Sequence, residues 1–270
     1  MIDDPSGRID YDETGSGPTL VLVPGSCSTG AAWRPIAATW NGKFRCVATS
    51  LLGYGGTAER RTEQDPSIDH EAKIVEAVIA NAGAGVHLVG HSFGGLISLA
   101  VAVGNRVSLK SLVIIEAPAV AILRERGELA HYRGFQQMTD AYFAAFKAGQ
   151  ADAIGMMIDF YGGPGTFASW PPKLRAYAME TTAVNLIDWT SAYGFAPSAA
   201  VLSAIDIPVL VITGSVSNPV VQRANALLAE SIQNAQFVTI EAAAHFMIAT
   251  HAGEVGRLIA EHVGRVEMAA

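Results

Sequence analysis

The sequence predicts an α/β fold, in which a mostly parallel sheet is flanked by helices and carries an α-helical cap insertion. Short apolar runs alternate with helical periodicity along most of the chain, as in consecutive strand–helix–strand units. That alternation stops between residues 119 and 200, where the pattern is mostly helical and rich in Phe, Tyr, Met and Trp. We therefore expect an α/β core from residues 1–118 and 201–270, and a helical cap (lid) from residues 119–200.

The apolar runs give the expected strands of the core. The run over residues 8–14 predicts an edge strand, which ends in the turn residues Gly15-Ser16-Gly17-Pro18. The run over residues 19–23 predicts a buried strand that stops at Pro24-Gly25. Further strands are expected over residues 44–49, 86–89, 109–115, 208–213 and 236–240.

Helical patterns fill the intervals between these strands. Ser67 or Asp69 can cap a helix that runs to about residue 82, since apolar residues recur on one face of it. Other helices are expected over residues 31–40, 93–103, 220–232 and 252–263. Half of the 270 residues are apolar and 16% are charged, so the chain can bury a sizeable core.

Charge and cysteine content exclude several classes of partner. The net charge is −7 and no Lys/Arg cluster stands out, which argues against a nucleic-acid partner. Cys27 and Cys46 have neither a disulfide-framework nor a zinc-site spacing, so we expect no metal, no cofactor and a reducing compartment. The chain starts without a signal-peptide pattern, and its most apolar run, residues 112–123, is too short to cross a bilayer. A cytoplasmic protein is expected, and the oligomeric state stays open, a homodimer included.

A nucleophile motif follows the expected strand over residues 86–89. In Gly90-His91-Ser92-Phe93-Gly94 the pattern Gly-x-Ser-x-Gly opens a helix, as a nucleophile elbow requires. The sharp turn exposes the serine oxygen, and the first N–H groups of the helix lie beside the charge that develops during attack. The pentapeptide alone is a weak signal; the strand before it and the helix after it favour Ser92 as a nucleophile.

Gly90-His91-Ser92-Phe93-Gly94-Gly95 resembles the elbow of the α/β-hydrolase fold superfamily, in its serine hydrolase, esterase-like branch. The resemblance extends over nearly the whole chain: the Pro24-Gly25 turn, the Gly53-Tyr54-Gly55 loop, the elbow, the insertion and a late histidine. It implies that a histidine in the loop after the last strand acts as general base. His245 occupies that place, in Ala244-His245-Phe246-Met247.

The acid of the implied triad departs from the usual pattern of that fold. Most members carry an Asp in the loop after the strand that corresponds to residues 208–213, but here the loop contains Ser217 and Asn218 and no carboxylate. Glu116 ends the preceding strand, where some branches of the superfamily place their acid. A charged residue that follows a run of apolar residues also needs a partner if it is buried. We expect Glu116 to be the acid, with Asn218 or Ser217 as the alternative.

Two backbone amides are expected to form the oxyanion hole. The resemblance implies that one is the N–H of Phe93, directly after the nucleophile, and that the other comes from the Pro24-Gly25 turn. By position in that turn, Ser26 donates the second N–H.

The implied reaction is hydrolysis of a carboxylic ester or lactone of a small apolar substrate, through an acyl-enzyme on Ser92. Haloalkane dehalogenases and epoxide hydrolases of the same fold are disfavoured, because they use an Asp where this chain has Ser92. A hydrolase of C–C bonds in diketones and a perhydrolase (cofactor-free haloperoxidase) share the triad and stay open as alternatives. A non-catalytic receptor for a small ligand is the alternative from another class.

Overall fold

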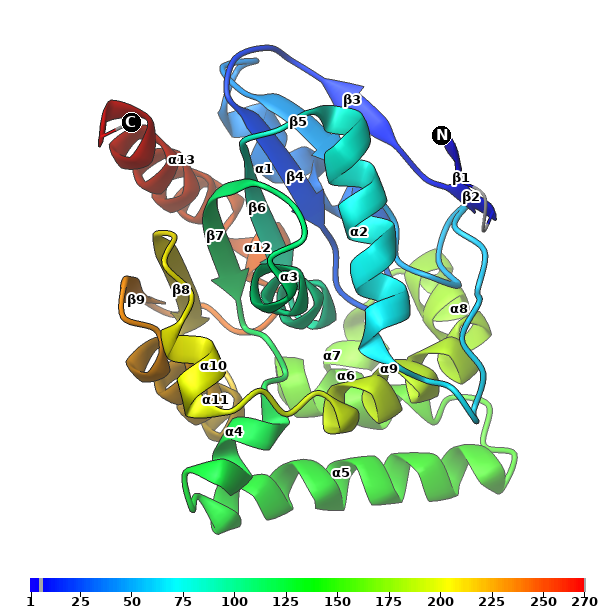
Figure 1. Cartoon of the computed structure of the whole chain (residues 1–270). Helices are drawn as coiled ribbons and strands as arrows, with labels where there is room; N and C mark the ends of the chain where they lie inside the picture. Colours follow the sequence, from blue (N-terminus) through cyan, green and yellow to red (C-terminus); the bar gives the residue numbers. More distant parts are fainter. Residues whose placement is uncertain (5–6, 270) are drawn as a thin grey trace.

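A seven-stranded sheet forms the centre of the molecule, with helices on both of its faces (Figure 1). The structure is a computed structural model and describes residues 1–4 and 7–269. In spatial order the strands are β3 (Asp12–Thr14), β5 (Arg45–Ala48), β4 (Thr19–Val23), β6 (Val86–His91), β7 (Leu109–Ile115), β8 (Val209–Gly214) and β9 (Ala235–Ile240). Only β3 runs antiparallel to its neighbour, so the predicted mostly parallel sheet is confirmed.

Two of the central strands are buried along their whole length. Every residue of β6 and β8 is buried, as expected for parallel strands that are covered on both faces. Parallel pairing also brings the carboxyl ends of β6, β7 and β8 to the same edge of the sheet. Loops at that edge are where open α/β sheets place ligands, so functional side chains are to be sought there.

Each face of the sheet has its own apolar core. Helices α2 (Ile68–Ala82), α3 (Phe93–Gly104) and α11 (Pro219–Ser231) contribute side chains to the core of one face. Helices α1 (Arg34–Thr39) and α13 (Ala252–Ala269) contribute to the other, behind the sheet in Figure 1. This three-layer arrangement is the predicted α/β fold.

Helices also fill the chain between β7 and β8. They are α4 (Val120–Glu125), α5 (Leu129–Lys147), α6 (Ile154–Gly162), α7 (Thr166–Ser169), α8 (Pro172–Glu180), α9 (Thr182–Gly194) and α10 (Ala199–Ser203). Most of them gather at the carboxyl edge of the sheet, in the lower part of Figure 1. The helical character predicted for this stretch is confirmed, while its separation from the core as a cap stays a prediction. No described helix has both the length and the apolar character needed to cross a membrane.

Two expected elements differ from the structure. The single edge strand predicted over residues 8–14 is wrong, because β2 (Gly7–Ile9) pairs with β1 (Ile2–Asp4) in a separate small sheet and only β3 joins the main sheet. Asp10 lies between them and pairs with neither strand partner: its backbone amide donates to the Thr57 hydroxyl at 3.0 Å. The helix predicted over residues 31–40 is a 3₁₀ turn, η1 (Gly30–Trp33), followed by α1. Pro35 stands in the first turn of α1, where its missing N–H costs nothing.

Candidate active site

Ser92 lies on a sharp turn between β6 and α3. Its φ is +54°, in the left-handed region that residues with a side chain rarely adopt. A Cβ at Gly90 would lie 2.3 Å from the Gly94 carbonyl oxygen, and one at Gly94 would lie 2.2 Å from the Pro24 carbonyl oxygen. The two glycines are therefore required by close packing of the backbone, and the strain at Ser92 is held by the strand and helix on either side.

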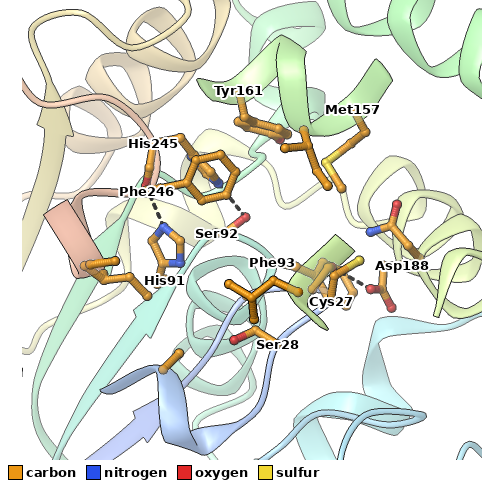
Figure 2. A pocket seen from close by; sticks show the side chains of 18 of the residues that line it. Cys27, Ser28, His91, Ser92, Phe93, Met157, Tyr161, Asp188, His245 and Phe246 are labelled. Atoms are coloured by element: carbon orange, nitrogen blue, oxygen red, sulfur yellow. Dashed lines mark hydrogen bonds between the residues drawn. The ribbon is translucent and has the colours of Figure 1, made fainter. Parts of the chain in front are cut away.

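His245 reaches Ser92 from the other end of the chain. It lies between β9 and the short helix α12 (Met247–Thr250), and its Nε2 atom is 3.0 Å from the Ser92 hydroxyl oxygen. Its Nδ1 atom is 2.8 Å from the Glu116 Oε2 atom. The structure thus brings together the three side chains that the sequence predicts, in the order serine, histidine, carboxylate (Figure 2 shows the Ser92–His245 pair).

Glu116 is fully buried at the carboxyl end of β7, and its φ is +49°. Its Oε1 atom accepts hydrogen bonds from the Thr213 hydroxyl and the Gly214 amide, both at 2.9 Å, and from the Ser217 hydroxyl. Burial alone would raise the pKa of this carboxyl group. The hydrogen bond and charge of His245, with the bonds from Ser217 and Gly214, outweigh burial and place the pKa of Glu116 below its usual value.

The alternative acid positions, Ser217 and Asn218, do not contact His245 through any bond among the described residues. Ser217 donates to Glu116 and so helps to hold the carboxylate. The Asn218 side chain accepts from the Val220 amide at the start of α11, and it donates to the Phe160 carbonyl oxygen at 3.0 Å. This loop therefore supports Glu116 and caps a helix.

A second histidine, His91, supports the first. It occupies a variable position of the Gly-x-Ser-x-Gly motif, so the motif does not predict this role. The His91 Nε2 atom donates to the backbone carbonyl oxygen of His245 at 2.9 Å, and the two rings lie 4.8 Å apart. Burial, with the charge that His245 carries when protonated, lowers the pKa of His91 to about 3. The His91 ring is therefore neutral at neutral pH and acts as a fixed donor that orients the His245 backbone.

The turn expected to contribute an oxyanion amide packs directly against the nucleophile. A Cβ at Gly25 would lie 2.9 Å from the Ser92 Cβ atom, so only glycine allows this approach. The Ser26 and Phe93 amides donate to no other group in the part of the chain that the structure describes. Both N–H groups are consequently available to a ligand on Ser92.

A cavity of about 640 Å³ opens over Ser92 and His245 (Figure 2). Its apolar lining comes mostly from the segment between β7 and β8, and it includes Met157, Ile158, Tyr161, Trp170, Leu174 and Trp189. The Tyr161 ring lies 4.0 Å from the His245 ring, between centroids, and so covers the histidine from above. No Lys or Arg is among the described residues that line the cavity, and Asp188 is its one carboxylate. Within residues 1–4 and 7–269, no three His, Cys, Asp or Glu side chains converge as metal ligands.

The chain resembles known proteins over most of its length. The sequence profile of the Alpha/beta hydrolase family matches residues 20–258. Haloalkane dehalogenase 2 of Mycobacterium tuberculosis is 33% identical over 113 residues, which are 42% of this chain and only 39% of that protein. Pimeloyl-(acyl-carrier protein) methyl ester esterase of Aeromonas hydrophila is 24% identical over 266 residues, which are 95% of this chain and 99% of that protein.

Among solved structures, a thermophilic esterase from Thermogutta terrifontis superposes with a TM-score of 0.76. The two chains are 20% identical, and the superposition covers 97% of this chain and 96% of the esterase. At that identity the likeness concerns the fold.

Proposed function

Because the chain belongs to the Alpha/beta hydrolase family, we propose that it is a serine hydrolase that cleaves a carboxylic ester or lactone of a small apolar substrate. The observation that carries the proposal is the unbroken chain of hydrogen bonds from Ser92 through His245 to Glu116. A serine hydroxyl becomes an effective nucleophile only when an oriented base can take its proton, and this arrangement supplies one.

The reaction has two halves. In the first, Ser92 Oγ attacks the carbonyl carbon and gives its proton to His245 Nε2, which then protonates the leaving alkoxide. In the second, a water molecule gives a proton to His245 and attacks the acyl-enzyme, and the Ser92 oxygen leaves with the proton that His245 returns. Glu116 stabilises the imidazolium in both halves, and the Ser26 and Phe93 amides receive the oxyanion. The products are a carboxylic acid and an alcohol.

The chemistry of the cavity favours a neutral substrate. Its walls are mainly apolar, and the absence of Lys and Arg among the described lining residues leaves nothing to pair with a substrate carboxylate. Asn185 offers a polar donor: the residue is 2% exposed, and its Oδ1 atom accepts from the Tyr142 hydroxyl at 3.0 Å. The Asn185 amide N–H₂ has no partner among the described residues and can bind a neutral oxygen of the substrate.

The nucleophile argues against dehalogenation, the reaction named for the Mycobacterium tuberculosis relative. Attack on an alkyl halide by a carboxylate gives an ester, which water can hydrolyse at its carbonyl carbon. Attack by Ser92 would give an ether, which has no carbonyl carbon and would inactivate the enzyme. We therefore place this chain with the hydrolases of acyl groups.

A substrate panel tests the proposal. It contains p-nitrophenyl esters of increasing acyl length, simple lactones, a vinylogous diketone, a haloalkane and, for perhydrolysis, an ester with hydrogen peroxide. We expect turnover of short and medium esters, and a loss of about 10³-fold or more in kcat for Ser92→Ala. Turnover of the diketone or of peroxide in preference to esters would move the function to those reactions. Ligand binding without turnover of any panel member would indicate a receptor.

A further inference from the structure

A buried ion pair lies next to the proposed oxyanion hole and outside the triad. Arg61, from the loop between β5 and α2, places its Nη1 atom 2.8 Å from the Oδ1 atom of Asp188 on α9. The two residues are 4% and 2% exposed. Because the desolvation of two buried charges is seldom fully repaid by their attraction, such a pair is poorly explained by stability alone.

Asp188 holds the oxyanion turn by a side chain. Its Oδ2 atom accepts hydrogen bonds from the Ser26 hydroxyl at 2.5 Å and from the Tyr54 hydroxyl at 2.6 Å. Ser26 is the residue whose backbone amide is proposed as an oxyanion donor. The next residue, Cys27, has a φ of +55°, so the turn contains a left-handed backbone that needs support from its surroundings.

Arg61 contacts the residue that carries the second amide. Its guanidinium carbon lies 6.0 Å from the centroid of the Phe93 ring, within the range of a cation–π contact. The two members of one ion pair therefore touch the side chains of both proposed oxyanion residues. Figure 2 shows Asp188 and Cys27 on the side of the cavity away from His245 and Phe246.

Arg61 lies among three carboxyl groups, those of Asp188, Glu59 and Glu71. Arg61 also binds Glu59 at 2.7 Å and lies 3.3 Å from the Oε1 atom of Glu71. Burial raises the pKa of Glu71 to about 8, so this carboxyl group is mostly protonated at neutral pH. Burial raises the pKa of Asp188, whereas the charge of Arg61 and the hydrogen bonds from Ser26, Tyr54 and Arg61 oppose that rise by favouring the charged form.

We propose that Asp188, held in place by Arg61, is a positioning residue that fixes the Ser26 turn so that the Ser26 and Phe93 amides converge on the oxyanion. The inference rests on the proposed hydrolase function. Since Asp188 belongs to α9 and Ser26 follows β4, the oxyanion hole is complete only when α9 is seated on the core.

The sharpest test is Ser26→Ala, which removes the hydroxyl group but keeps the backbone amide. We expect kcat for a p-nitrophenyl ester to fall about 10-fold, less than the 10²–10³-fold known for loss of a whole oxyanion donor, because the amide is displaced and not removed. KM should change less than about threefold. The affinity for an alkylboronic acid, which forms a tetrahedral adduct with the serine, should fall by the same factor as kcat.

Tyr54→Phe is the comparison variant, since it removes another hydroxyl from the same Asp188 oxygen; this hydroxyl meets the oxyanion turn at Cys27 and makes no bond to Ser26. Its kcat should fall clearly less than that of Ser26→Ala. Asp188→Asn should lower kcat at least as much as Ser26→Ala, and the double variant should lose little more than Asp188→Asn alone. If Asp188→Asn does not fold, because it leaves Arg61 short of a carboxylate, the comparison of the two hydroxyl variants decides the matter.

The positioning role is refuted if Ser26→Ala keeps kcat and boronic acid affinity within about twofold of wild type, or if Tyr54→Phe is equally damaging. Failure of the proposed function would look different. The wild-type protein itself would then turn over no ester and would bind no boronic acid.

Discussion

Replacing Glu116 by Gln should slow ester hydrolysis by about 10³–10⁴-fold with little change in fold. The Oε1 atom of Glu116 accepts three hydrogen bonds, including those from Thr213 and Gly214 at 2.9 Å, while Oε2 faces only His245 Nδ1 at 2.8 Å. The glutamine carbonyl oxygen must take the position with three donors, so its NH₂ group must point at His245 Nδ1. That nitrogen can then only accept, and the imidazole proton moves to Nε2.

The wrong tautomer accounts for the magnitude. With a proton on Nε2, His245 cannot accept the proton of Ser92 at 3.0 Å, and no carboxylate charge remains to stabilise an imidazolium. In serine proteases with the same arrangement the equivalent replacement lowers kcat about 10⁴-fold, which corresponds to about 5.5 kcal/mol in the activation barrier.

Steady-state kcat with a p-nitrophenyl ester, beside thermal unfolding of each variant, measures the effect. Asn218→Ala is the control, because Asn218 caps α11 and does not contact His245. It should cost about 1 kcal/mol of stability and no more than about fivefold in kcat. The reasoning is refuted if Glu116→Gln keeps more than a tenth of the wild-type kcat, or if Asn218→Ala is the more damaging change.

Three further changes probe the site and the core. Tyr161→Phe should raise the free energy of unfolding by about 1 kcal/mol in a urea titration, because the buried Tyr161 hydroxyl has no hydrogen-bond partner among the described residues; a loss of stability would reveal a partner. Gly25→Ala should lower kcat at least about 10²-fold, since its Cβ would lie 2.9 Å from that of Ser92, whereas Gly264→Ala, with no atom within 4 Å, should leave kcat unchanged. Burial, with the charge of Arg265, lowers the pKa of His262 to about 4. The neutral His262 therefore costs the folded state nothing above about pH 6.5, the usual pKa of a histidine. As the pH drops from there toward 4, the free energy of unfolding should fall by up to about 1.4 kcal/mol per pH unit. In His262→Gln that acid dependence should be shallower, and an unchanged slope in unfolding titrations at several pH values would contradict it.

The sequence predicts the sheet well because its central strands are mostly apolar and mostly buried. The runs over residues 19–23 and 109–115 coincide with β4 and β7, and the run over residues 86–89 extends to His91 in β6. Pairing partners are less predictable. The residue pattern over residues 8–14 does not predict that its first part pairs with β1 and its last part with β5. Strand pairing depends on residues that are distant in sequence.

Glu116 directly follows a predicted strand, Ser92 lies in the motif after another, and His245 lies in the loop after the last, where the resemblance implies the base. Parallel strands end at one edge of the sheet, so the three can be singled out together. Asp188 and Tyr161 cannot be found in this way. Asp188 lies within a helical stretch and meets Ser26 across 162 residues, and Tyr161 is one aromatic residue among many in that stretch. Which of these aromatic residues covers the histidine is decided by how the helices pack, and no local pattern encodes it.

The central claim is that Ser92 carries the acyl group during catalysis. Intact-protein mass spectrometry after treatment with a p-nitrophenyl alkylphosphonate, followed by peptide mapping, tests it directly, because the phosphonate mimics the tetrahedral intermediate and stays attached. The account predicts one adduct per chain, on Ser92, with hydrolysis of esters lost in proportion to labelling and no adduct in Ser92→Ala. Labelling at another residue with Ser92 unmodified, or full labelling of Ser92→Ala, would contradict it.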